Sequence, residues 1–321
     1  MFTSVIDKAG FTLLMFAVLS SIVSCASRQK SQAESKSTNG TVKQMTPNDL
    51  QIKEEILGLR QLLYADSSLK ELASSSRFDS NEMVDDQGRR RQLSSTDFEI
   101  NKVFDNACLL IENGKPQQAL DFLQSVNIKH DLKHDPAYWL VSAYARQQLG
   151  NLQECRQSLH EFLKSPEIDS REVLNVWQIL RELGDKPESA NQVLGVIAEM
   201  GHEETVVIVA GYADGESRLF LGSGGGVIGK KESFPEETRI AAKELVAAAQ
   251  PFVNNLPLEH VRDLPKRGQV RFALLTSSGI YVIKDEIAHL NKQDSQFYPV
   301  WRATNTLLTP LLRFMLEEQK K

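Results

Sequence analysis

The chain has 321 residues, of which 41% are apolar and 25% are charged. This composition is that of an ordinary globular protein, and the length allows about two domains. The formal net charge of −5 excludes a general affinity for nucleic acid. Its three cysteines are too few for a disulfide framework or a zinc cluster.

The N-terminus has the layout of a secretory signal peptide. Lys8 precedes an uncharged apolar run from Phe11 to Val23, and the small residue Ser24 follows it. The run is shorter than the ~20 residues that a membrane-spanning helix needs. The sequence therefore predicts a signal peptide over residues 1–24, with an uncleaved anchor as the alternative.

The residues that end this run, Leu19 to Cys25, resemble the lipobox of bacterial lipoproteins. The resemblance implies that the Cys25 thiol carries a diacylglycerol, that cleavage occurs before Cys25, and that the new N-terminus is acylated. Two or more acyl chains anchor a protein stably to a membrane. Ala26 and Ser27 follow, without the Asp that retains such lipoproteins at the inner membrane, so an outer-membrane protein facing the periplasm is expected. Ordinary secretion with an ordinary cysteine is the alternative.

Two further segments precede the first strongly periodic region. Residues 25–45 are polar, with few large apolar groups, and are expected to form a flexible tether. Residues 46–97 are expected to hold a helix that begins at Thr46-Pro47, followed by a polar loop.

Three glycines then divide a helical region at regular intervals. Gly114, Gly150 and Gly184 lie 36 and 34 residues apart, and each follows an apolar-periodic segment. A period near 34 residues with helix–turn–helix units is typical of tetratricopeptide repeats. The sequence around these glycines resembles that family in divergent form, which predicts helical repeats over residues 98–202.

The small residue that lets two repeat helices pack closely has a counterpart after each glycine. Ala119 follows Gly114 by five residues, Cys155 follows Gly150, and Ser189, with Ala190 next to it, follows Gly184. The resemblance implies a concave groove that binds peptides or helices of other proteins. The residues expected to line it are Tyr138, Trp139, Tyr144 and Arg146. The alternative is packing inside the repeat, which we favour for Trp139.

The last segment, residues 203–321, changes to a strand pattern. Thr205–Ala210 is a short β-branched run, and Asp214-Gly215 indicates a turn before a returning strand. A helix, a second hairpin around Ser277-Ser278 and a terminal amphipathic helix follow. The order ββ-α-ββ-α predicts a small αβ domain with an antiparallel sheet, so the whole chain is expected to be α+β.

A glycine-rich loop joins two of these elements. Gly224 to Lys230 fits the phosphate-loop pattern G-x-x-x-x-G-K, but Lys231 occupies the position where that loop needs Ser or Thr. We therefore expect a flexible loop or a bulged edge strand that could accept a partner strand, and no nucleotide. Its glycines are Gly222, Gly224, Gly225, Gly226 and Gly229.

No motif in the sequence indicates a metal site or catalysis. His130 and His134 have the spacing of two zinc ligands on one helix, but Pro136 follows, which favours a polar turn. No nucleophile motif occurs, although a triad that is assembled only in the fold cannot be read from one sequence. We expect no cofactor, no metal and no enzymatic activity.

These features together predict a membrane-anchored lipoprotein that acts as a protein–protein interaction adaptor or scaffold in the bacterial cell envelope. The alternatives are an envelope enzyme, or a periplasmic ligand-binding module that uses the C-terminal αβ domain. An enclosed apolar pocket would favour the ligand-binding module, and an open groove would favour the adaptor.

Overall fold

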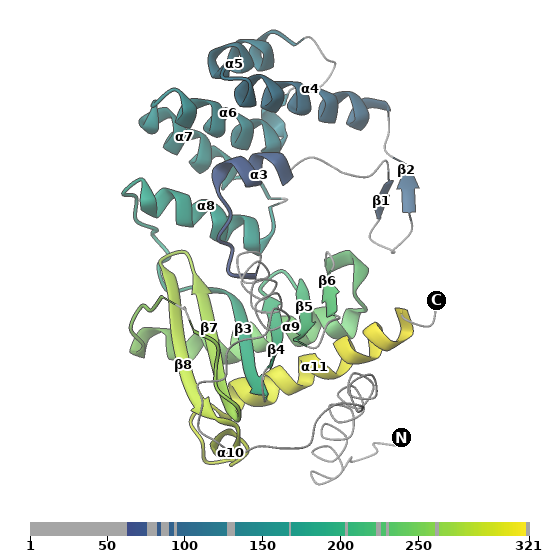
Figure 1. Cartoon of the computed structure of the whole chain (residues 1–321), viewed down its shortest axis with the longest axis vertical. Helices are drawn as coiled ribbons and strands as arrows, with labels where there is room; N and C mark the ends of the chain where they lie inside the picture. Colours follow the sequence, from purple (N-terminus) through teal and green to yellow (C-terminus); the bar gives the residue numbers. More distant parts are fainter. Residues whose placement is uncertain are drawn as a thin grey trace, which may run out of the picture.

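A computed structural model of the chain is shown in Figure 1. It describes residues 63–75, 82–84, 90–92, 95–126, 132–166, 168–202, 205–222, 226–228, 231–260 and 263–318. Cys25, the tether, the start of the helix expected from Thr46, His130 and the glycines Gly224, Gly225 and Gly229 lie outside these residues.

The first half of the described chain is helical. After α3, a two-stranded hairpin (β1 and β2) precedes α4; α4 then pairs with α5, and α6 pairs with α7 (Figure 1). The last helix of this half, α8, has no antiparallel partner helix in the described chain and contacts α3, α7 and the strand β3. The bounds are α3 Leu69–Ser75, β1 Glu82–Val84, β2 Arg90–Gln92, α4 Ser95–Glu112, α5 Pro116–Ser125, α6 Pro136–Gln148, α7 Leu152–Phe162 and α8 Ser170–Glu182.

Each of the three regularly spaced glycines ends a helix in the same way. Gly114, Gly150 and Gly184 have φ values of 72°, 77° and 93°, in the left-handed region that glycine adopts without steric cost. At Gly150, the backbone N–H groups of Gly150 and Asn151 donate to the carbonyls of Gln147 and Arg146, at 3.0 and 2.9 Å. This pattern is a Schellman motif, and it recurs at the other two glycines. The predicted helix-ending turns are therefore confirmed.

The prediction of a third helical pair was wrong. The described residues directly after Gly184 form no helix: Ser189 and Ala190 lie in a turn, and Val193–His202 forms the strand β3. Val193, Val196, Ile197 and Met200 have helical spacing, but they lie in a strand that is buried on both faces. A strand of this kind gives a continuous apolar run that periodicity cannot distinguish from a helix.

The second half is built around one antiparallel sheet of six strands. Their order across the sheet is β6-β5-β4-β3-β7-β8, so β3, which the sequence did not predict, lies near its centre. The two predicted hairpins, β4–β5 and β7–β8, are confirmed. The predicted order ββ-α-ββ-α becomes ββββ-α-ββ-α, and the mixed α+β class is consistent with the structure. The bounds are β4 Thr205–Tyr212, β5 Ser217–Leu221, β6 Gly226–Ile228, β7 Gln269–Thr276 and β8 Gly279–Glu286.

Helices cover both faces of the sheet. Helices α9 (Glu236–Ala249) and α11 (Tyr298–Glu318) pack on one face through a large apolar core. The other face is covered by α8 and by residues 63–65, which share a core with Ile197, Ile208 and Tyr212. Helix α8 therefore connects the helical half to the sheet (Figure 1). The shorter helical turns are η1 Leu132–His134, η2 Lys231–Ser233, η3 Gln250–Asn255 and α10 Ile287–Leu290.

Candidate functional site

A short N-terminal segment is held between α8 and the sheet. We call residues 63–68 the strap. The Tyr212 hydroxyl donates to the carbonyl of Leu63 at 2.8 Å, and the Tyr64 hydroxyl donates to Glu199 Oε1 at 3.0 Å. On the α8 side, the Ser67 N–H donates to Asn175 Oδ1 at 3.0 Å. The strap therefore links both halves of the molecule.

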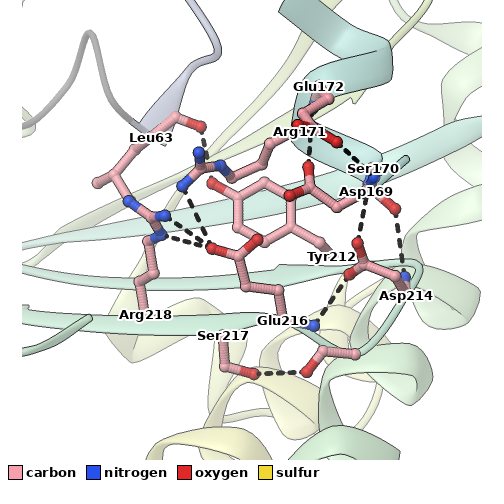
Figure 2. A network of polar contacts seen from close by, with 11 residues as sticks. Leu63, Asp169, Ser170, Arg171, Glu172, Tyr212, Asp214, Glu216, Ser217 and Arg218 are labelled. Carbon is pink, nitrogen blue, oxygen red and sulfur yellow. Dashed lines mark hydrogen bonds and ion pairs between the residues drawn. The ribbon is translucent and has the colours of Figure 1, made fainter. Parts of the chain in front are cut away.

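Next to the strap lies a network of charged side chains that we call the α8 network (Figure 2). Glu216 is 5% exposed, and its Oε1 accepts hydrogen bonds from Arg218 Nε at 3.0 Å and Arg218 Nη2 at 2.7 Å. Arg171, at the start of α8, donates to the same oxygen at 3.2 Å. The network therefore joins the first turn of α8 to the turn between β4 and β5.

The other acidic groups of the α8 network hold backbone N–H groups. Asp214 Oδ2 accepts from the Ser170 N–H at 2.8 Å, and the Ser170 hydroxyl accepts from the Asp214 N–H at 3.2 Å. Asp169 and Glu172 form a capping box at the start of α8. Single oxygens of Asp169, Asp214 and Glu216 lie within 4.8 Å of one another, close enough to share a metal ion. Their hydrogen bonds already explain this clustering as helix capping and turn formation.

Burial sets the protonation behaviour of this network. Burial raises the pKa of Glu216 to about 8, because desolvation outweighs the attraction of Arg171, and Asp169 and Asp214 add repulsion. Burial also raises the pKa of Tyr212, so its hydroxyl stays protonated and donates to the strap. Glu216 is therefore a titratable group near neutral pH at the junction of the two halves.

A second charged feature lies on the same face of the sheet, toward its other edge. Glu199, Arg271 and Lys284 are directly opposite one another on β3, β7 and β8. Glu199 is fully buried, Arg271 is 6% exposed, and the two form an ion pair. Lys284, at the exposed end of this row, pairs with Glu259.

The row formed by Glu199, Arg271 and Lys284 leads into a cavity of about 630 Å³ that we call the β7–β8 hollow. Its floor is formed by the strand ends 269–271 and 284–286, and its wall by the described residues of 259–266. A Cβ added at Gly201 on β3 would clash with the carbonyl oxygen of Lys266, so the wall rests directly on the sheet. Gly268 donates to the Gly201 carbonyl at 3.0 Å and fixes the end of the wall.

The residues expected to line a groove in the helical half are placed mostly inside it. Tyr138 and Tyr144 are each 6% exposed and belong to the helical core. Trp139 is half-buried, and its indole N–H donates to the carbonyl of Lys133 at 3.0 Å. Arg146 pairs with Glu154 and donates to the Ser158 hydroxyl. These side chains hold the helices together and offer little surface to a partner.

The described glycines of the glycine-rich loop are required by close packing. A Cβ at Gly222 would clash with the Thr205 side chain, and one at Gly226 with the carbonyl of Leu219. Gly226 begins β6, the edge strand next to β5. His134 lies in η1, in front of α6, as the predicted turn requires.

The sequence analysis missed both charged features. Glu199 and Arg271 are isolated charges within apolar runs that form strands. Charged residues are almost never fully buried without a partner, so an isolated charge in a buried strand indicates a cross-strand ion pair. That signal is readable for Arg271, but not for Glu199, because the residues of β3 have the periodicity of a helix.

The comparisons leave the family open. No protein-family model, curated protein or solved structure matches the chain. Within the described residues, no helix is both long and apolar enough to cross a bilayer.

Proposed function

We propose that this protein is a lipid-anchored component of the bacterial cell envelope, in the outer membrane and facing the periplasm, that acts as an adaptor by binding another protein. The lipobox-like residues ending at Cys25 support the anchor, and the paired helices with repeated glycine turns support divergent tetratricopeptide-like units. The role is one of binding and not of catalysis.

The strongest support for the adaptor role is that large apolar side chains are exposed on α4. Phe98 and Leu109 are 55% and 56% exposed. They are 11 residues apart, about three helical turns, so they lie on the same side of the helix. This side of α4 replaces the buried tyrosines of α6 as the proposed partner surface.

The anchor is tested with Cys25→Ala and the neighbouring control Ser27→Ala. Intact mass of the membrane-extracted wild-type protein should give a chain that begins at Cys25 with added acyl mass. Ser27→Ala should behave identically, whereas Cys25→Ala should lack the acyl mass and leave the membrane fraction or accumulate unprocessed. A lipid-free wild-type chain would overturn the anchor.

The partner surface is tested with the double variant Phe98→Ser and Leu109→Ser. The matched control is Ile240→Ser with Leu316→Ser, which removes two exposed apolar side chains, 48% and 44% exposed, from the sheet half. Crosslinking in intact cells should give a defined product with wild type and control that the α4 variant loses. A product that survives in the α4 variant contradicts the surface.

The second candidate, a periplasmic ligand-binding module, is favoured by the β7–β8 hollow. The hollow is lined by charged groups and is not an enclosed apolar pocket. A ligand of the αβ half would therefore be polar.

A further inference from the structure

The β7–β8 hollow has the size of a small-molecule site. Its volume of about 630 Å³ falls within the range of roughly 300–1,000 Å³ that is typical of ligand pockets. The adaptor role proposed above does not use it, because the hollow belongs to the sheet half and the exposed Phe98 and Leu109 of α4 belong to the helical half.

A buried arginine forms part of the hollow's floor. The guanidinium of Arg271 is held by Glu199 on one side and by the carbonyl of Asp263 on the other. Its Nε is buried and has no hydrogen-bond partner within the described part of the chain. A fixed, desolvated cation with unused donor capacity favours an anionic oxygen in its neighbourhood.

Both signs of charge line the hollow. Lys266 adds positive charge to that of Arg271, while Glu286 at the end of β8 adds negative charge. Lys284 and Asp285 also line the hollow, but they are paired with Glu259 and His289. A ligand of one sign would meet like charges on the same lining. A ligand that carries both an ammonium and a carboxylate can satisfy both sets of groups.

The described part of the wall is fixed by contacts with the rest of the protein. The Lys266 backbone rests on Gly201, and Leu264 packs into the core between the sheet, the strap and α8. The Ile287 N–H donates to the carbonyl of Gly268 at 2.9 Å, which ties the end of the wall to the end of β8. Binding to such a site does not have to order its walls, so less of the interaction energy is lost.

We propose that the β7–β8 hollow binds a short zwitterionic peptide, with its carboxylate toward Arg271 and Lys266 and its ammonium toward Glu286. The site binds the two charged ends of the peptide and does not select among its side chains. The ligand is therefore a free oligopeptide and not an internal segment of a folded protein.

The experiment is calorimetric titration of the full chain with trialanine, N-acetyl-trialanine and trialanine amide. These probes have the same neutral side chains and differ in their charged ends. Trialanine should bind saturably, and each blocked analogue should bind about tenfold more weakly, the loss expected for one charged hydrogen bond. Absence of saturable trialanine binding, or equal binding of the three peptides, would overturn the proposal.

Two exposed lining residues locate the site. Lys266→Gln should weaken trialanine while leaving trialanine amide unchanged, and Glu286→Gln should weaken it while leaving N-acetyl-trialanine unchanged. The matched controls, Lys243→Gln and Glu244→Gln, change exposed charges on α9, against the opposite face of the sheet. Trialanine affinity that is unchanged in both hollow variants, or lowered equally by the controls, would place binding elsewhere and overturn the assignment.

Discussion

The two halves of the molecule differ in what they bury. The buried polar residues of the described helical half are uncharged: Ser142, Ser158, Ser170 and Asn175. The sheet buries Glu199, Glu216, Arg218 and Arg271. The helical half is thus held by apolar packing and local turn signals, whereas the sheet depends on charged partners that are distant in sequence. Buried charge is costly unless it is paired, so one substitution in the sheet should disrupt more than one in the helices.

The largest expected effect comes from breaking the buried pair of the sheet. Glu199→Ala leaves the Arg271 guanidinium buried without its carboxylate and should lower the free energy of unfolding by about 4 kcal/mol. Replacing both residues by Met should restore most of this loss, because an apolar pair needs no partner. Urea unfolding measures both variants. If Glu199→Ala is as stable as the exposed control Glu188→Ala, the ion pair contributes nothing to the free energy of unfolding.

Next in size is the contact between the wall of the hollow and the sheet. Gly201→Ala forces a Cβ against the Lys266 backbone and should destabilise the protein by about 3 kcal/mol, since backbone atoms cannot rotate away. Hydrogen exchange should also become faster in residues 263–268. A melting temperature and exchange pattern equal to those of wild type would mean that the wall does not rest on β3.

The pH dependence of stability tests the α8 network. The pKa of Glu216 is about 8 in the folded protein and 4.5 in its unperturbed state, so between these values the folded state retains a proton that the unfolded state releases. Stability should therefore fall as pH rises through this window and stop falling above it.

Glu216→Gln should remove this slope, and the exposed control Glu237→Gln should keep it. The measurement is the urea midpoint at a series of pH values. A slope that is the same in wild type and Glu216→Gln would assign the titration to another group.

The smallest effect is expected in the helical half. Gly150 has nothing within 4 Å of the position where a Cβ would lie, so Gly150→Ala costs only the left-handed backbone conformation, about 1 kcal/mol. Gly150→Asn should cost less, because Asn tolerates this conformation. Thermal unfolding compares the two. A loss of stability as large as that of Gly201→Ala would show that Gly150, like Gly201, is required by close packing and not only by its backbone conformation.

The same difference explains how much of the fold could be predicted from the sequence. The Schellman turns depend on a glycine and its near neighbours, and the hairpins around Gly215 and Gly279 depend on short turn sequences, so these were predicted correctly. Strand β3 was not, because its identity comes from burial between β4 and β7, which no local window contains.

The candidate site was harder to predict for the same reason. Pairs such as Arg171 with Glu216, and Tyr64 with Glu199, are 45 and 135 residues apart. Periodicity in one sequence carries no information on such pairs. The helical aromatic residues were assigned to a groove because the repeat pattern fixes a helix but not which of its sides faces the neighbouring helix.

The strap has a consequence for the order in which the chain folds. Its hydrogen-bond partner Tyr212 is 149 residues away, and its packing partners Ala273 and Leu275 are farther still. During synthesis from the N-terminus, these early residues lack part of the surface that they pack on until β7 has been made. The strap should therefore close last and slowly, as expected for contacts of such long range, and its apolar side chains stay exposed until then.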